Sequence, residues 1–196
     1  MANMERLKLN LEKRGYAVSH FATAQEAADY LDSQIDGCTV GFGGSVSVQE
    51  MGLQPRLAAH NDTFWHWDKG TLAQAASTDV YLSSVNGAAE TGELINIDGT
   101  CNRVSSILYG HKRVYLVVGA NKVAPDYDSA LWRARNVAAP KNAQRLQKNT
   151  PCAAKGDRCY DCQSPDRICR GLVVLWGIPE SVERMEVVLV DQDLGY

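Results

Sequence analysis

The regular alternation of helical and strand patterns constrains the fold of this chain more than any other feature. Continuous apolar runs at residues 114–118 and 187–190 are typical of strands that are covered on both faces. Amphipathic helical patterns separate such runs, and this order favours parallel strands joined by helices. The sequence therefore predicts a three-layer α/β fold, with a mainly parallel sheet flanked by helices.

The individual elements follow from local signals. Thr23 and Glu26 form a predicted capping box ahead of a helix. Asp98 and Gly99 follow an apolar run at 94–97, which predicts a tight turn and an antiparallel hairpin arm. The helices are expected at 3–13, at 24–34 and between 127 and 146, and the strands at 17–21, 39–42, 63–65, 80–83, 114–118, 173–176 and 185–190.

Composition limits the class of protein. With 45% hydrophobic residues in 196, the chain can bury a core of its own, so we expect one domain over residues 1–196. A formal charge of -3 argues against general nucleic-acid binding, which needs clustered cations. Residues 1–14 lack the apolar centre of a signal peptide, and no stretch is long enough to span a bilayer. We therefore expect a cytoplasmic protein without membrane insertion.

A cysteine-rich loop at residues 149–170 interrupts the regular pattern. It contains Cys152, Cys159, Cys162 and Cys169 among charged residues, where packing cysteines are unusual. Cys159 and Cys162 have the spacing of one zinc knuckle, so the four thiols are candidate ligands for structural zinc or an iron–sulfur cluster. Disulfides or reduced thiols remain the alternative, although a reducing cytoplasm favours metal or redox chemistry.

A glycine-rich segment follows the predicted strand at 39–42. Gly43, Gly44 and Ser45 lead from this strand into a helix, and glycines let a ligand approach backbone amides. Ser47 and Glu50 form a predicted capping box, which leaves Ser45 free to contact a ligand. We expect a small anion here, although a simple strand-to-helix turn without a ligand fits the same pattern.

Further polar residues follow other predicted strands. Asn86, Glu90 and Thr91 come after the strand at 80–83, where open α/β sheets bind ligands. Glu90 lies among small residues and is the candidate catalytic acid, base or nucleophile, with a solvated or capping carboxylate as the alternative. Asn121 and Lys122 come after the strand at 114–118 and are expected to bind the ligand.

Arg133 completes the expected anion site. It belongs to a basic helical stretch that also fits an ordinary solvated face.

Several motifs together resemble one protein family. They are Gly41-Phe42-Gly43-Gly44-Ser45, Gln49-Glu50-Met51-Gly52-Leu53, Ala89-Glu90-Thr91-Gly92, Val118-Gly119-Ala120-Asn121-Lys122-Val123, Pro140-Lys141-Asn142-Ala143-Gln144-Arg145 and the cysteine-rich loop. In this order they resemble the lactate-utilisation (LUD) domain family, which includes the LutC and YkgG proteins, across residues 1–196. The resemblance implies a fold similar to the NagB, ribose-5-phosphate isomerase and coenzyme A transferase group.

The resemblance also implies a function. Such proteins take part in bacterial oxidation of L-lactate to pyruvate, together with an iron–sulfur partner and an oxidase-like partner. We therefore expect an accessory component that binds a small anionic metabolite, with a homo-oligomer as a further expectation. The cysteine-rich loop is more similar to that of short stand-alone LUD proteins. A stand-alone enzyme of the coenzyme A transferase or sugar-phosphate isomerase type, or a non-catalytic metal-stabilised assembly module, therefore remains open.

Overall fold

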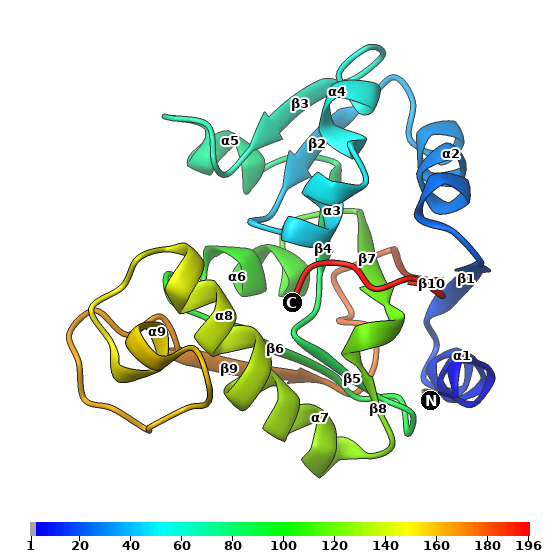
Figure 1. Cartoon of the computed structure of the whole chain (residues 1–196). Helices are drawn as coiled ribbons and strands as arrows, with labels where there is room; N and C mark the ends of the chain where they lie inside the picture. The colour runs from blue at the N-terminus through cyan, green and yellow to red at the C-terminus, as the bar shows by residue number, and fades with distance from the viewer. Residues whose placement is uncertain (1–2) are drawn as a thin grey trace.

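The structure, a computed structural model, describes residues 3–196 and contains two sheets (Figure 1). A six-stranded sheet has the order β1-β10-β7-β4-β2-β3 with every neighbouring pair parallel, and a four-stranded sheet has the order β8-β5-β6-β9. The elements are α1 (Met4–Lys13), β1 (Ala17–Phe21), α2 (Ala24–Gln34), β2 (Thr39–Phe42), α3 (Val46–Glu50), α4 (Leu53–Leu57), β3 (Asp62–Trp65), α5 (Leu72–Ala75), β4 (Val80–Ser84), β5 (Gly87–Ala89), β6 (Leu94–Asp98), α6 (Asn102–Leu108), β7 (Arg113–Gly119), a 3-10 turn (Ala120–Lys122), β8 (Val123–Ala124), α7 (Tyr127–Arg133), a π-helical turn (Ala134–Ala138), α8 (Ala139–Arg145), α9 (Pro151–Lys155), β9 (Gly171–Leu175) and β10 (Arg184–Val190).

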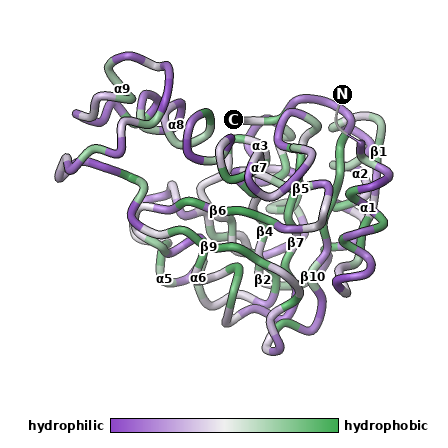
Figure 2. Tube along the Cα trace, turned by 90° about the horizontal axis from the view of Figure 1, so that it is seen from below, coloured by the Kyte–Doolittle hydropathy of each residue, from purple (hydrophilic) through white to green (hydrophobic). Residues whose placement is uncertain are grey.

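The large parallel sheet is buried on both faces, as its apolar strands predict. Along β7, Leu116 and Val118 pack with α1 and α6, whereas Val117 points to the opposite face and packs with α2, α3 and α4. Side chains of a strand alternate between faces, so a strand covered on both sides must be apolar throughout. The predicted three-layer α/β fold with a mainly parallel sheet is confirmed. Figure 2 shows the hydrophobic residues concentrated along the strands.

Local signals account for the helix starts. Thr23 accepts a hydrogen bond from the Glu26 amide at 3.2 Å, and the Glu26 carboxylate accepts one from the Thr23 amide at 3.0 Å, so the predicted capping box forms. The expected helix at 3–13 begins one residue later, because Asn3 is its cap and accepts from the Arg6 amide.

The four-stranded sheet differs from the sequence-based expectation. The antiparallel hairpin arm expected at 94–97 forms as β6, but the Asp98-Gly99 segment is not the hairpin turn, because the Asp98 carboxylate accepts hydrogen bonds from the amides of Cys101 and Val104 and so leads into α6. Instead, β6 pairs antiparallel with β5 before it and with β9, far along the chain. The strand expected at 173–176 is therefore a member of the second sheet.

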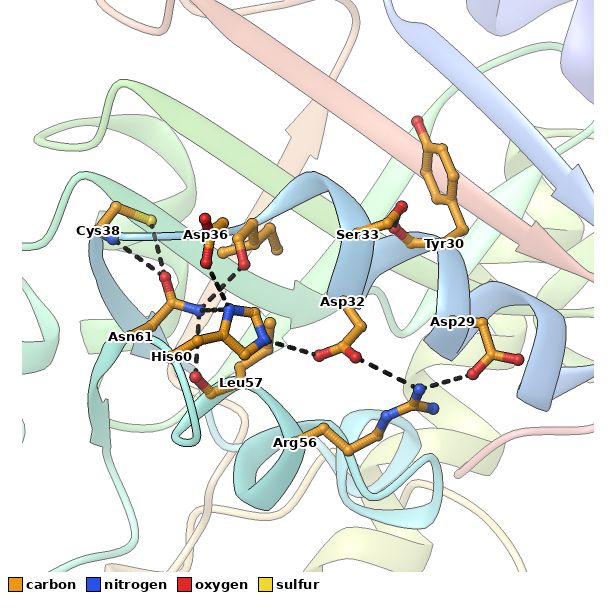
Figure 3. A network of polar contacts seen from close by, with 11 residues as sticks. Asp29, Tyr30, Asp32, Ser33, Asp36, Cys38, Arg56, Leu57, His60 and Asn61 are labelled. Carbon is orange, nitrogen blue, oxygen red and sulfur yellow. Dashed lines mark hydrogen bonds and ion pairs between the residues drawn. The ribbon is translucent and has the colours of Figure 1, made fainter.

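A polar network joins α2 to the end of α4 (Figure 3). The Arg56 guanidinium contacts Asp29 at 2.6 Å and Asp32 at 3.4 Å. The His60 ring contacts Asp32 at 3.0 Å and Asp36 at 2.9 Å, and these two carboxylates raise the pKa of His60. The network thus ties two helices on the same face of the large sheet.

None of the helices within residues 3–196 combines the length and the apolar character needed to cross a bilayer.

Candidate functional site

A cleft of about 490 Å³ lies where three neighbouring parallel strands end. Residues that follow β2, β4 and β7 line it, including Ser45, Asn86 and Lys122. In open α/β sheets the carboxyl edge of the strands is the usual place for a ligand. The cleft therefore has the position that the sequence predicted.

The floor of the cleft, defined here as Lys122, Ser47 and Ser84, is buried and polar. The Lys122 ammonium nitrogen, Nζ, lies 2.7 Å from the hydroxyl of Ser47 and 2.7 Å from that of Ser84. Burial, together with the nearby charges of Arg133 and Arg103, lowers the pKa of Lys122 to about 7. A lysine in these conditions changes its charge near neutral pH, whereas an exposed lysine does not.

Arg103 of α6 also lines the cleft and joins the two sheets. Its guanidinium donates to the Ser84 and Ile97 carbonyls, each at 3.0 Å, and to the amide oxygens of Asn96 and Asn86. These bonds connect the end of β4 to β6, so Arg103 fixes Asn86 in the wall of the cleft. The sequence pattern did not single out Arg103, because its acceptors come from segments that are distant in the chain.

Arg133 and Asn121, which the sequence predicted to bind the ligand, do not line the cleft and instead hold residues around it. The Arg133 guanidinium donates to the carbonyls of Asn121 and Asn86, each at 2.6 Å, and burial lowers the pKa of Arg133 to about 10. The Asn121 amide accepts from Leu194 at 3.1 Å and donates to Gly195 at 3.2 Å, which holds the last residues of the chain beside the floor.

Gly44 and Ser45 line the cleft, whereas Gly43 does not. A Cβ at Gly44 would lie 2.9 Å from the indole nitrogen of Trp67, and a Cβ at Gly43 would lie 2.8 Å from the Tyr81 hydroxyl. Close packing therefore requires both glycines.

Ser45 is not free, contrary to the sequence-based expectation. Because α3 begins at Val46, Ser45 is its cap and accepts from the Val48 amide at 3.3 Å. Ser47 lies inside the helix and contacts Lys122, while the Glu50 carboxylate accepts from the Gly195 amide at 2.7 Å. The predicted capping box of Ser47 and Glu50 is therefore wrong, and it is the Ser47 hydroxyl, not that of Ser45, that contacts Lys122 in the floor.

The rim of the cleft, defined as Arg145, Lys148, Arg167 and Arg170, is cationic. Arg145 lies over the ring of Trp67, with its guanidinium carbon 5.1 Å from the ring centroid. Two carboxylates, Asp98 and Asp166, line the same cleft, and Asp98 lies 3.8 Å from Arg103. The rim therefore offers an excess of positive charge to an anion.

Glu90 and Thr91, which the sequence predicted as site residues, do not line the cleft. The Glu90 carboxylate accepts hydrogen bonds from the Asn3 amide at 2.9 Å and from the Arg6 guanidinium at 3.3 Å. The backbone carbonyl of Glu90 accepts a hydrogen bond from the Asn10 side chain. The Thr91 carbonyl accepts from Arg14. Both residues thus face α1, and these contacts favour a structural role for Glu90.

The four cysteines of the loop are half-buried free thiols with different neighbours. Cys152 contacts the Thr150 hydroxyl at 3.3 Å, Cys159 accepts from the Asp161 amide at 3.4 Å, and Cys169 accepts from the Arg167 guanidinium at 3.3 Å. Within residues 3–196 no three His, Cys, Asp or Glu side chains lie close enough together to hold a metal ion.

Comparison with known proteins gives a family. The sequence matches the model of the LUD domain over residues 4–190. No curated protein matched it. Among solved structures, the fold is similar to that of a DUF162 family protein from Deinococcus radiodurans, with a TM-score of 0.56, 14% sequence identity and 95% of each chain covered. That identity establishes likeness of fold alone. Because the family model spans nearly the whole sequence, this chain belongs to the LUD domain family.

Proposed function

We propose that this protein is an accessory component of bacterial lactate utilisation and that its cleft binds a small organic carboxylate. The observation that carries the proposal is the combination of a polar floor at Lys122 with a cationic rim. A carboxylate in such a cleft gains charge-assisted hydrogen bonds, which are stronger than neutral ones. Membership of the LUD domain family, which is associated with lactate use, supports the same function.

The size of the cleft agrees with a small metabolite. About 490 Å³ is within the range of small-molecule sites and leaves room for a ligand larger than lactate. A ligand enlarged by a phosphate or a second carboxylate would still find cations at the rim. L-lactate, pyruvate, inorganic phosphate and coenzyme A are therefore the first compounds to compare.

Binding of these compounds is measured by calorimetry with the wild-type protein and with Arg145→Gln. Removal of one charge-assisted contact costs roughly 1.5–3 kcal/mol, so the affinity for a carboxylate is expected to fall about tenfold or more. Lys141→Gln is the matched control, because Lys141 is an exposed cation of α8 that does not line the cleft. Equal weakening by the two substitutions, or no binding of any of the four compounds, would contradict the proposal.

The partner subunits implied by the family resemblance belong to the same proposal. Co-purification of the chain from lactate-grown cells is expected to recover an iron–sulfur protein and an oxidase-like protein. Recovery of the chain without either partner would favour the stand-alone alternatives.

A further inference from the structure

Lys122 has an environment that anion binding alone does not require. Its side chain is 3% exposed, and within the described part of the chain no carboxylate lies within ion-pair distance of it. Its polar contacts are the hydroxyls of Ser47 and Ser84. A buried lysine without a counter-ion loses hydration free energy, which favours its neutral form.

Only the neutral amine of Lys122 can act as a nucleophile. Amines attack carbonyl carbons through the nitrogen lone pair, and protonation removes that lone pair. With a pKa of about 7, a large share of Lys122 is neutral at physiological pH, whereas an exposed lysine is almost wholly protonated there. A neutral amine keeps two N–H groups, enough to donate to the hydroxyls of both Ser47 and Ser84, and its lone pair stays free.

We propose that Lys122 forms an imine with the carbonyl carbon of a short 2-oxo acid bound in the cleft. This inference rests on the proposed binding of a small carboxylate in the same cleft and adds a covalent step to it. The ligand class follows from the two parts of the cleft. The cleft lining supplies both groups that such a ligand needs, cations for the carboxylate and the Lys122 amine for the carbonyl carbon.

The step is balanced without an oxidant or a reductant. The Lys122 nitrogen bonds to the carbonyl carbon while the carbon–oxygen π bond breaks, and a proton moves from nitrogen to that oxygen to give a carbinolamine. The carbon–oxygen bond then breaks, the remaining N–H proton joins the leaving hydroxyl to give water, and the electron pair left on nitrogen forms the carbon–nitrogen double bond. The hydroxyls of Ser47 and Ser84 lie at hydrogen-bond distance from the nitrogen and are placed to relay the proton.

The chemistry also separates oxidised from reduced substrates. A 2-hydroxy acid such as lactate has the carboxylate but no carbonyl carbon, so it binds without forming an imine. A 2-oxo acid has both groups. The cleft would thus hold the oxidised member of such a pair covalently and the reduced member by charge alone.

The test uses borohydride, which reduces an imine to a stable secondary amine. The full chain is incubated with pyruvate or glyoxylate, treated with borohydride, digested and analysed by mass spectrometry. Lactate supplies a carboxylate without a carbonyl, and acetone supplies a carbonyl without a carboxylate. Lys122→Met and Lys122→Arg remove the nucleophile, and Lys141→Arg changes an exposed lysine of α8 as the matched control.

We expect one reduced adduct on the peptide that contains Lys122, with the 2-oxo acids and not with lactate or acetone. The trapped fraction should fall as the pH drops below about 7, because the amine becomes protonated. Lys141→Arg should retain the adduct. Should the Lys122 variants fail to fold, the peptide map and the pH dependence of the wild-type protein still decide the question.

Calorimetry with the same compounds separates this inference from the proposed function. Binding of pyruvate that depends on Arg145, without a trapped adduct on Lys122, would overturn imine formation and leave carboxylate binding intact. An adduct spread over exposed lysines would likewise overturn it. Absence of binding for every carboxylate would overturn both.

Discussion

At the scale of single residues, Glu90 connects the start of α1 to the turn between β5 and β6. Glu90→Gln keeps the shape of the side chain but weakens the charged contacts with Asn3 and Arg6. We expect the free energy of unfolding to fall by at most roughly 1.5–3 kcal/mol, the scale of a hydrogen bond to a charged group. Carboxylate affinity should stay unchanged, because Glu90 does not line the cleft. Urea titration and calorimetry provide the two measurements.

Glu12→Gln is the control for this substitution, since Glu12 is an exposed carboxylate of the same helix. A catalytic role for Glu90 predicts the opposite pattern, with lost turnover or growth on lactate and unchanged stability.

The buried amine of Lys122 also makes stability depend on pH. Its pKa is about 7 in the folded protein and near the ordinary value of 10.5 in the unfolded chain. Between these values the unfolded chain binds more protons, so the folded state gains stability as the pH rises, by at most about 1.4 kcal/mol per pH unit. Below about pH 7 Lys122 is protonated in both the folded and the unfolded chain, so the loss of stability from burying its charge no longer changes with pH.

Lys122→Met removes this dependence. The free energy of unfolding of the wild-type protein, relative to the variant, is therefore expected to increase from about pH 7 to about pH 10. Parallel pH profiles of the two proteins would mean that Lys122 keeps its charge when buried.

At the scale of elements, the cysteine-rich loop contributes to the cleft as well as carrying thiols. Arg167 of this loop lines the cleft, and its guanidinium donates to the Cys162 carbonyl at 3.0 Å and to the Cys169 thiol. If zinc or a cluster binds the four thiols, we expect a chelator to increase hydrogen exchange in residues 149–170 and to weaken carboxylate binding, while the large sheet stays protected.

Metal analysis of protein purified without oxygen accompanies that measurement. Cys159→Ser should abolish metal retention, and Cys38→Ser should not, because Cys38 precedes β2 and contacts Asn61 and Arg113 instead. Loop protection that is insensitive to chelator and lost on reduction would indicate disulfides.

The network between α2 and α4 gives a second pH-dependent prediction. Asp32 and Asp36 raise the pKa of His60, so protonated His60 stabilises the folded state. This contribution is complete below about pH 6.5 and is lost as the pH rises through the raised pKa. The stability difference between wild-type protein and His60→Gln should therefore shrink on going from about pH 6 to about pH 9. A constant difference would show that the ring contributes by packing instead.

Sequence patterns predict some elements well and others poorly for a physical reason. β7 and β10 carry enough consecutive apolar residues to be recognised alone, because both of their faces are buried. β5 has three residues and β8 has two, so their strand character depends on pairing, of β5 with β6 and β8 and of β8 with β5. The second sheet was missed for that reason.

At the scale of the whole molecule, the charge of the cleft opposes the charge of the chain. The formal net charge is -3, yet the rim of the cleft is cationic. Salt screens contacts between exposed charges over about 10 Å at 0.1 M. We expect carboxylate affinity to fall steadily with added salt, and less steeply in Arg145→Gln than in Lys141→Gln. Equal salt dependence in calorimetry of both variants would mean that the rim does not contact the ligand.

The candidate site was predicted in part. Gly44, Ser45, Asn86 and Lys122 were found because each follows a recognisable strand. The rim was not assigned from the sequence, because the basic helical stretch that contains Arg145 also fits a solvated face and Arg167 lies in an irregular loop. Only the folded chain brings these cations to one opening.

The division of the cleft into floor and rim also bears on how such a protein can change over generations. The floor residues lie in regular elements at the carboxyl edge of the large sheet, since Ser84 ends β4, Ser47 lies in α3 and Lys122 ends the 3-10 turn after β7, whereas the rim lies within residues 145–170, outside the strands. Substitutions, insertions or deletions in that stretch can alter which acid is accepted while the reactive amine stays in place. Paralogues are therefore expected to differ in the acid that they bind through changes confined to this one short segment.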